Sequence, residues 1–197
     1  KAMRVSSGWA KGMQLETPPG EGTTRPTSEK VRAATLNALM PHLEGARFLD
    51  LFAGSGAVGI EAVSRGANGA VFVDSGRQPL ACLKNNLAEL ERRAGKQAIV
   101  LAPLAVVPTD ALEAMGRLAS HGSFDAGFVD PPYAAAAEWA ERLLAPLFAL
   151  FTSGAVLAFE SAAKDEARIA AAAARAGWQV MKQKSYGDTM VTTMEKE

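Results

Sequence analysis

The ten residues Asp50-Leu51-Phe52-Ala53-Gly54-Ser55-Gly56-Ala57-Val58-Gly59 decide the fold of this 197-residue chain. Gly54, Gly56 and Gly59 satisfy the spacing GxGxxG, in which small residues let the backbone turn tightly and approach a ligand closely. The loop follows a short apolar run over residues 48–52 and precedes a segment whose apolar residues recur at helical spacing. A glycine loop between a strand and a helix predicts a ligand site at the carboxyl edge of a parallel sheet.

Strands and helices alternate outward from this loop. Short apolar runs predict strands at residues 48–52, 70–73, 98–101, 124–129 and 155–159. Helical spacing predicts helices at residues 28–43, 58–63, 78–93, 110–119, 135–150 and 164–176. Two extended stretches, at residues 178–184 and 190–194, predict a closing hairpin. We therefore expect an α/β, Rossmann-like protein with a mostly parallel seven-stranded sheet, a C-terminal antiparallel hairpin and helices on both faces.

The first 26 residues differ from the rest of the chain in composition. Glycines, prolines and short alternating stretches are concentrated between residues 4 and 26. Such a composition predicts a small N-terminal β-hairpin arm followed by a turn-rich linker. We expect the arm and linker to occupy residues 1–26 and one main domain to occupy residues 27–197.

The composition narrows the classes of function. Lysine plus arginine and aspartate plus glutamate both total 21, so the formal net charge is zero. That balance excludes a protein that binds nucleic acid by bulk charge alone, but it permits a local basic patch. With Cys82 as the single cysteine and His42 and His121 as the only histidines, we expect no metal site. No apolar run reaches the roughly 18 residues of a membrane span, and no secretory signal is visible, so we expect a cytoplasmic enzyme. We also expect it to be a monomer.

Two carboxylates near the glycine loop bear on the choice of ligand. Asp50 stands at the mouth of the first strand, where a dinucleotide would bring its pyrophosphate close. Two like charges about 4 Å apart repel by on the order of 1 kcal/mol in water, and by more in a cleft. S-adenosylmethionine has no phosphate and carries an ammonium and a sulfonium, which a carboxylate attracts. Asp74 ends the second strand, where it can hold a pair of ribose hydroxyls. The residues favour S-adenosylmethionine, with a dinucleotide or a purely structural glycine turn as the alternatives.

A second motif, Asp130-Pro131-Pro132-Tyr133, follows the predicted fourth strand. A purely structural interpretation is available, in which the two prolines end the strand and the tyrosine covers the core. However, the carboxyl ends of parallel strands meet at one edge of a sheet, so this motif should lie beside the glycine loop. Its position therefore favours a role in chemistry on a molecule bound there.

The residue types in this motif suit methyl transfer to an exocyclic amine of a base. Such an amine is a poor nucleophile because its lone pair is delocalised into the ring. The Asp130 carboxylate and the Pro131 carbonyl can each accept one hydrogen of the amine, which favours a pyramidal nitrogen. Pro132 has no N–H that would compete for these acceptors. Tyr133 offers a face for stacking, worth about 1–3 kcal/mol per base. Positioning would supply much of the catalysis, on a base flipped out of its helix.

With both motifs in place, nearly the whole chain resembles the bacterial guanine-N2 methyltransferases of 16S ribosomal RNA, the RsmD type. The segments that carry the resemblance run from the N-terminal arm to the last turn: Arg4–Gly8 with Lys11-Gly12, Arg25-Pro26-Thr27, Val31-Arg32, Leu36-Asn37, Asp50–Gly59, Ser64-Arg65-Gly66-Ala67, Asp130–Tyr133 and Tyr186-Gly187-Asp188-Thr189. The resemblance implies a class I methyltransferase fold, S-adenosyl-L-methionine as cofactor, and 16S rRNA in a small ribosomal subunit or assembly intermediate as partner.

The resemblance and the motifs together give a set of candidate site residues. The candidates for catalysis are Asp130, Pro131, Pro132 and Tyr133. The candidates for cofactor binding are Thr27, Asp50, Phe52, Ala53, Gly54, Ser55, Gly56, Gly59, Asp74, Ser75, Asp110 and Ala111. The candidates for RNA binding are Arg4, Lys11, Arg25 and Tyr186.

Other functions remain open at this point. A DNA adenine or cytosine amine methyltransferase would use the Asp-Pro-Pro-Tyr motif in the same way, but we see no separate target-recognition domain in 197 residues. A protein glutamine methyltransferase would more usually have asparagine at position 130. From different classes, an NAD-dependent oxidoreductase or a non-catalytic RNA-binding module would also fit parts of the sequence.

Overall fold

The computed structural model describes residues 3–19 and 26–197, the side chains of residues 26–28 excepted. Arg25 and the side chain of Thr27, both candidates for the site, lie outside the described residues. Over the described residues, no helix is both long and apolar enough to cross a membrane.

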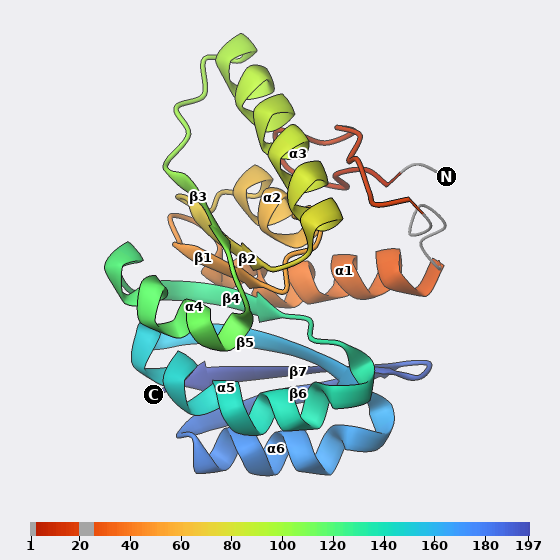
Figure 1. The fold of residues 1–197 in the computed structure, drawn as a ribbon, viewed down its shortest axis with the longest axis vertical. Coiled ribbons are helices and arrows are strands. Elements are labelled where there is room, and N and C mark those ends of the chain that lie inside the picture. The colour runs from red at the N-terminus through yellow and green to blue at the C-terminus, as the bar shows by residue number, and fades with distance from the viewer. Residues whose placement is uncertain (1–2, 20–25) are drawn as a thin grey trace.

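The centre of the fold is a seven-stranded sheet in the order β3-β2-β1-β4-β5-β7-β6 (Figure 1). Five strands are parallel, and β7 is antiparallel to both of its neighbours. The strands are β1 (Phe48–Leu51), β2 (Ala70–Asp74), β3 (Leu104–Pro108), β4 (Phe124–Val129), β5 (Phe151–Ala162), β6 (Trp178–Tyr186) and β7 (Thr189–Lys196). The predicted Rossmann-like architecture, with its C-terminal antiparallel hairpin, is confirmed.

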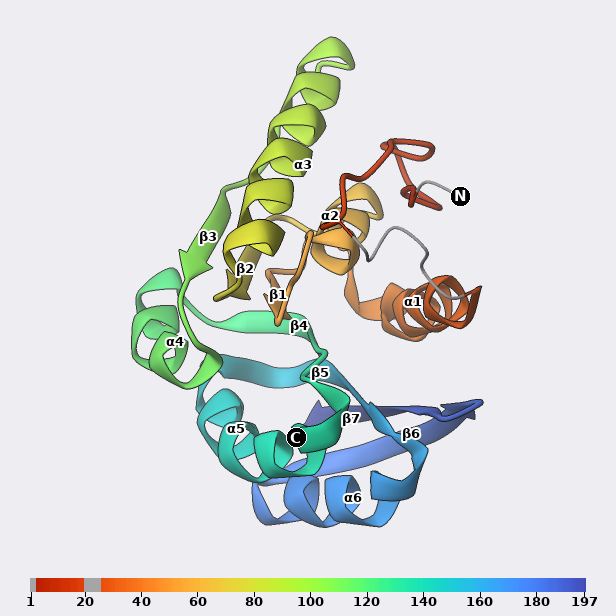
Figure 2. The ribbon, with the colours of Figure 1, turned by 45° about the vertical axis from the view of Figure 1, so that its right-hand side comes forward.

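Helices cover both faces of the sheet (Figure 2). They are α1 (Pro26–Leu39), α2 (Ala57–Ser64), α3 (Arg77–Lys96), α4 (Ala111–Leu118), α5 (Ala136–Leu150) and α6 (Glu166–Arg175), with 3-10 turns at Met40–His42, Ala119–His121, Tyr133–Ala135 and Ala163–Asp165. Successive strand residues point to opposite faces. Leu49 and Leu51 therefore pack in a core with α4, α5 and α6, while Phe48 packs in the core under α1, α2 and α3.

The predicted third strand was wrong. We expected it at residues 98–101, but α3 continues to Lys96, and Val100 is 95% exposed. The strand is Leu104–Pro108, because this second apolar segment pairs in register with Ala70–Asp74 of β2. Both apolar runs fit the pattern of a strand. Because α3 extends to Lys96, residues 98–101 lie in the connection after the helix, and the second run pairs with β2.

The N-terminal arm folds back on itself loosely and packs on the body. One antiparallel bridge joins Arg4 to Gln14, and the Val5 amide donates to the Met13 carbonyl at 3.0 Å. Val5, Met13 and Leu15 are buried in the core under α1, α2 and α3. The arm is thus attached by apolar contacts, and the boundary between arm and main domain at residue 26 stays a prediction.

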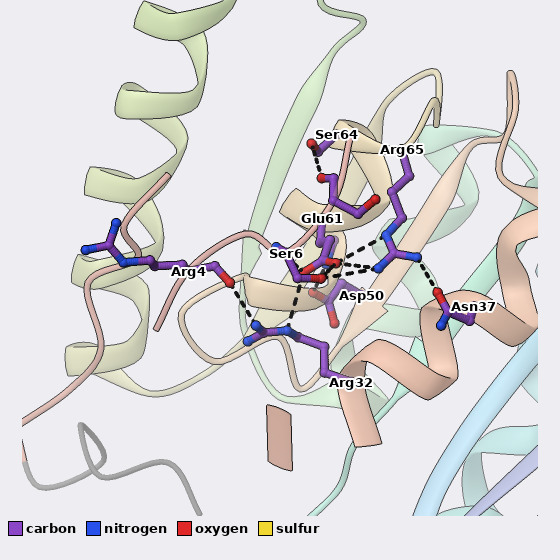
Figure 3. A network of polar contacts seen from close by, with 10 residues as sticks. Arg4, Ser6, Arg32, Asn37, Asp50, Glu61, Ser64 and Arg65 are labelled. Atoms are coloured by element: carbon purple, nitrogen blue, oxygen red, sulfur yellow. Dashed lines mark hydrogen bonds and ion pairs between the residues drawn. The ribbon is translucent and has the colours of Figure 1, made fainter. Parts of the chain in front are cut away.

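A buried carboxylate on α2 links the arm to the helices (Figure 3). Glu61 has no exposed surface. It accepts hydrogen bonds from the Ser6 amide at 3.2 Å, from the Ser6 hydroxyl, and from Arg65 Nη2 at 2.6 Å. Arg32 Nε of α1 lies 3.5 Å from the same carboxylate, and Arg32 Nη2 donates to the Arg4 carbonyl at 2.9 Å. Three segments far apart in the sequence are therefore held by one buried anion.

We predict that Glu61→Gln destabilises the protein strongly. The substitution keeps the size of the side chain but leaves two largely buried guanidinium groups without their counter-charge, and breaking a buried ion pair typically costs about 3–5 kcal/mol. Urea unfolding would measure the change in the free energy of unfolding. The control is Glu89→Gln, which removes a partly exposed carboxylate that pairs with Arg92 and Arg93 on α3, where little change is expected. Equal effects of the two substitutions would contradict the role given to Glu61.

Candidate active site

The glycine loop turns sharply between β1 and α2. Phe52, Gly54 and Gly56 have positive φ values of 61°, 57° and 82°. A Cβ atom on Gly56 would lie 2.4 Å from Leu83 Cδ1, so glycine is required there for close packing as well as for conformation. A Cβ on Gly54 would meet no atom within 4 Å, which leaves that side of the loop open to a ligand.

Two carboxylates hold this loop from neighbouring strands. Asp50 Oδ2 accepts the Gly59 amide at 2.8 Å, and Asp50 is 2% exposed. Asp74 Oδ2 accepts the Gly54 amide at 2.8 Å, and its Oδ1 accepts the Gly76 amide at 2.7 Å. Both aspartates therefore shape the backbone that a ligand would meet, and each keeps lone pairs for further hydrogen bonds.

A cavity of about 200 Å³ opens at the carboxyl edge of the sheet beside this loop. Its walls come from the arm, α1 and the ends of β1, β4 and β5. They are formed by Met3, Arg32, Asp50, Phe52, Ala53, Gly54, Ser55, Ala57, Val58, Phe128, Asp130 and Glu160. The structure thus brings Asp130 together with five of the predicted cofactor-binding residues, from Asp50 to Ser55.

The second motif begins where β4 ends. The Asp130 amide donates to the Leu51 carbonyl at 3.2 Å, so its backbone is fixed against β1. The Tyr133 hydroxyl donates to Glu160 Oε1 at 2.6 Å and lies 2.5 Å from Thr189 Oγ1. Tyr133 is 40% exposed, so these bonds anchor its hydroxyl while part of its ring stays accessible. Hydrogen bonds of both backbone and side chain therefore hold the motif at the sheet edge.

The cavity concentrates acidic groups in a buried place. Burial raises the pKa of Asp50 to about 7, and the charge of Asp74 adds to the effect, while the Gly59 amide opposes it. Burial, with the charges of Glu160 and Asp50, also holds the pKa of Asp130 well above its ordinary value. The pKa of Glu160 is raised by burial. A cationic ligand would relieve this crowding of carboxyl groups, whereas a pyrophosphate would worsen it.

The site thereby fits S-adenosylmethionine better than a dinucleotide. Asp50 and Asp130 would attract its two cationic groups, and Arg32 on the opposite wall would attract its carboxylate. Gly54 supplies the space for close approach. A purely structural glycine turn would explain neither the cavity nor the buried charges.

The sequence did not identify three polar residues of the site, Arg32, Glu160 and Thr189. It also did not identify four apolar or small residues that line the cavity, namely Met3, Ala57, Val58 and Phe128. Glu160 directly follows the predicted fifth strand, so the same edge rule that selected Asp130 would have found it. Arg32 and Thr189 stood in the quoted segments, but only their contacts reveal their positions. Arg32 lines the cavity from α1, and Thr189 reaches Tyr133 from β7.

Some predicted cofactor residues lie beside the cavity and do not line it. Gly56 and Gly59 serve packing and the hydrogen bond to Asp50. Asp110 caps α4 by accepting the Leu112 amide at 2.9 Å, and Ala111 is buried. Asp74 ends β2 and Ser75 follows it, while Asp110 and Ala111 come after β3. All four therefore lie at the same sheet edge as the glycine loop. Their roles in holding the ribose and adenine stay predictions.

The predicted RNA-binding residues lie in two separate places. Arg4 and Lys11 are exposed on the arm, where Arg4 Nη1 makes a long contact of 3.5 Å to the Gly12 carbonyl. Tyr186 ends β6 and is half-buried, with Lys184 Nζ 5.1 Å from its ring centroid. Their contacts with RNA stay predictions.

Comparisons with known proteins agree with the fold. "Ribosomal RNA small subunit methyltransferase D" of Escherichia coli is 38% identical over 132 residues, which are 66% of this chain and 60% of that protein. "Putative rRNA methyltransferase YlbH" of Bacillus subtilis is 41% identical over 132 residues, or 66% of this chain and 67% of that protein. The solved structure "Putative methyltransferase yhhF from Escherichia coli" superimposes with a TM-score of 0.75 and 28% identity, over 100% of this chain and 99% of that one.

Fold and site together define a class I, S-adenosylmethionine-dependent methyltransferase. The model of the family described as "Conserved hypothetical protein 95" matches residues 3–195. The chain belongs to this family, and the RsmD-type resemblance is confirmed.

We predict that Asp50 makes cofactor binding pH-dependent. With its pKa raised to about 7, Asp50 loses its proton as the pH rises from 6 to 8, and only the ionised form attracts a cation strongly. The dissociation constant for S-adenosylmethionine, measured by calorimetry, should therefore fall several-fold over this interval. In Asp50→Asn the affinity should be lower at pH 8, and most of the pH dependence should disappear; any slope that persists reports on Asp130 and Glu160. An unchanged slope would contradict the assignment.

The raised pKa of Asp50 also makes the stability of the ligand-free protein depend on pH. The pKa of Asp50 is higher in the folded protein than in the unfolded chain, so the folded state binds more protons between about pH 4 and pH 7. Stability should fall as the pH rises through that interval. Asp50→Asn, which can still accept the Gly59 amide, should show a smaller fall.

Proposed function

We propose that this methyltransferase modifies the exocyclic N2 amine of a guanine in 16S rRNA, within a small ribosomal subunit or an assembly intermediate. The observation that carries the proposal is the position of Asp130, whose side chain lines the same cavity as Gly54 and the rest of the glycine loop. The names of the relatives support rRNA as the class of substrate. We also propose that the enzyme acts in the cytoplasm as a monomer without membrane contact.

In this proposal the second motif holds the target amine. The Asp130 carboxylate accepts one hydrogen of the amine and the Pro131 carbonyl accepts the other, which directs the nitrogen lone pair into the cavity. Tyr133 stacks on the flipped base, with its hydroxyl fixed by Glu160 and Thr189. The cofactor, when bound, supplies the electrophilic methyl group.

Methyl transfer leaves a positive charge on the amine nitrogen, which must then lose a proton. Asp130 is well suited to accept it, since burial and the neighbouring carboxyl groups raise the pKa of Asp130. The motif alone does not require a strongly shifted pKa. The raised pKa adds a role as proton acceptor to the positioning role that the motif predicted.

We assign the cofactor to the loop and its flanking carboxylates. Asp50 would meet the ammonium, Arg32 and Thr27 the methionine end, and Asp74 with Ser75 the ribose. Asp110 and Ala111 would border the adenine. Arg4, Lys11, Arg25 and Tyr186 would contact the RNA.

The alternatives receive less support. An NAD-dependent oxidoreductase would have to place a pyrophosphate near Asp50, Asp130 and Glu160, three carboxyl groups that line one cavity. A DNA or protein methyltransferase would keep the chemistry and change only the substrate, and the relatives favour rRNA over both. A non-catalytic RNA-binding module would give no role to the carboxyl group of Asp130 in the cavity.

The experiment that tests the proposal uses labelled S-adenosylmethionine and small ribosomal subunits that lack the modification. We expect label in 16S rRNA and N2-methylguanosine as the modified nucleoside, identified by mass spectrometry after digestion. A different methylated nucleoside would overturn the assignment of the target atom. Label in protein, or in DNA supplied in parallel, with none in rRNA would overturn the assignment of the substrate.

We predict that Asp130→Asn lowers kcat by about 10²–10⁴-fold, the usual contribution of a positioned proton acceptor. Asparagine keeps the size of the side chain and one acceptor oxygen but cannot take the proton. The assay is run at saturating S-adenosylmethionine, because the substitution also removes a charge that attracts the cofactor. The thermal unfolding temperature serves as the control for folding and should not fall appreciably. A kcat within twofold of the wild type would refute the role of Asp130.

A further inference from the structure

A second hollow lies between α1 and the C-terminal hairpin. Its volume is about 320 Å³, and it shares no lining residue with the cavity around Asp130. One wall is the face of α1 that contains Ala34, Thr35 and Asn37. The opposite wall is formed by β6 and β7. We call this hollow the hairpin cleft.

The sheet register connects the hairpin cleft to the active site. Val191 of β7 pairs with Glu160 of β5 on one side and with Lys184 of β6 on the other. Directly paired residues present their side chains on the same face of a sheet. Neighbouring strands are about 4.8 Å apart, so the backbone of Lys184 lies two strands, or about 10 Å, from that of Glu160. Glu160 is the residue that accepts the hydrogen bond from the Tyr133 hydroxyl. A strand of RNA with its target base in the active site would therefore pass close to the cleft.

The hairpin wall has the chemistry of a nucleotide site. Lys182 and Lys184 are exposed and line the cleft, and neither forms an ion pair with a carboxylate in the part of the chain that is described. Tyr186 lines the same wall beside Lys184. Two such cations would bind phosphate, and an aromatic ring would stack on a base. In a chain of zero net charge, this pairing is a local basic patch.

The α1 wall contains a polar group that needs a partner. Thr35 is 1% exposed, and its hydroxyl has no hydrogen-bond partner among the described residues. Buried polar groups without partners are rare in folded proteins and call for an explanation. The Asn37 side-chain oxygen accepts from Arg65 Nη1 at 2.8 Å, which leaves its amide nitrogen as a donor toward the cleft. A ligand with hydroxyl or base-edge groups would satisfy both.

We propose that the hairpin cleft binds a nucleotide of the substrate RNA next to the flipped guanine. Its phosphates would lie at Lys182 and Lys184, its base would lie against Tyr186, and Thr35 and Asn37 would bond its ribose or base edge. This inference rests on the proposed function, because it extends the same RNA path. RNA is favoured over an acidic peptide, since the carboxylates of a peptide would use the lysines but give the ring of Tyr186 no base to stack on.

The lysines are tested by affinity and its salt dependence. The dissociation constant for protein-free, unmodified 16S rRNA is measured at several salt concentrations for the wild type and for Lys182→Ala/Lys184→Ala. We expect an affinity loss of about 10-fold or more at low salt. The slope of the logarithm of the affinity against the logarithm of the salt concentration should become less steep by about 1.4, because each lost phosphate contact of a single strand contributes about 0.7. On small subunits, KM should rise while kcat and the affinity for S-adenosylmethionine stay unchanged. Lys96→Ala, at the far end of α3, is the control.

Thr35→Val separates binding from folding. Valine has the shape of threonine without the hydroxyl, so removing an unpartnered buried polar group should leave the unfolding temperature equal or higher. The affinity for 16S rRNA should nevertheless fall several-fold. A merely structural role for Thr35 would not give this combination.

The outcomes distinguish this inference from the proposed function. Suppose that the wild type methylates rRNA and that the lysine variant keeps the wild-type affinity and salt slope. That result would overturn the cleft assignment and leave the proposed function standing. A loss of activity on subunits with unchanged affinity for protein-free rRNA would also overturn the cleft assignment, because the cleft would then contact a ribosomal protein. If the wild type methylates no rRNA, the proposed function fails, and the cleft inference fails with it.

Discussion

The arrangement of the site depends on one buried carboxylate, that of Glu61. It lies on α2, the helix that begins at the glycine loop, and it has no exposed surface. A buried charge must be paired, and its partners come from the arm through Ser6 and from α1 through Arg32. The same Arg32, together with Met3 of the arm, forms the cavity wall that the sheet does not supply. One ion-pair network therefore fixes the loop, the helix and the arm relative to one another, and the cavity is the space that they enclose.

The chain has zero net charge, but its charged groups are unevenly distributed. Asp50, Asp130 and Glu160 gather at the cavity, where burial raises the pKa of each. Arg32 lines the same cavity, whereas Lys182 and Lys184 lie apart from it on the exposed hairpin. Crowded buried carboxyl groups destabilise a ligand-free protein, and proteins keep such arrangements mainly at functional sites. A cationic ligand in the cavity offsets this destabilisation. The carboxyl groups therefore disfavour a ligand with a phosphate in the cavity, while the basic hairpin surface stays available to a polyanion.

The sequence predicted those parts of the structure that local patterns determine. The central strands β1, β2 and β4 were found because each is a short apolar run followed by a loop, and the edge rule is enough to bring Asp50 and Asp130 together. The third strand was wrong because residues 98–101 and Leu104–Pro108 are both apolar, and only pairing with β2 distinguishes them. Arg32 and Thr189 were missed because their contacts span long separations in sequence, such as the 56 residues between Tyr133 and Thr189. Glu160, which directly follows a predicted strand, could have been found by the edge rule. Local pattern gives elements and their ends, whereas partners across the sheet follow from topology.

The antiparallel insertion of β7 between β5 and β6 joins the two ends of the proposed RNA path. Because β7 pairs with β5, Thr189 lies beside Ala162 and reaches the hydroxyl of Tyr133. Because β7 also pairs with β6, the same residue lies opposite Tyr186. The hairpin therefore contacts the tyrosine of the target motif directly through Thr189. In a sheet that was parallel throughout, the last strand would need a long crossover, and no short turn could place an exposed basic strand this close to the motif. The terminal hairpin therefore does more than close the sheet, since it couples the surface proposed to hold the RNA to the residue proposed to hold the base.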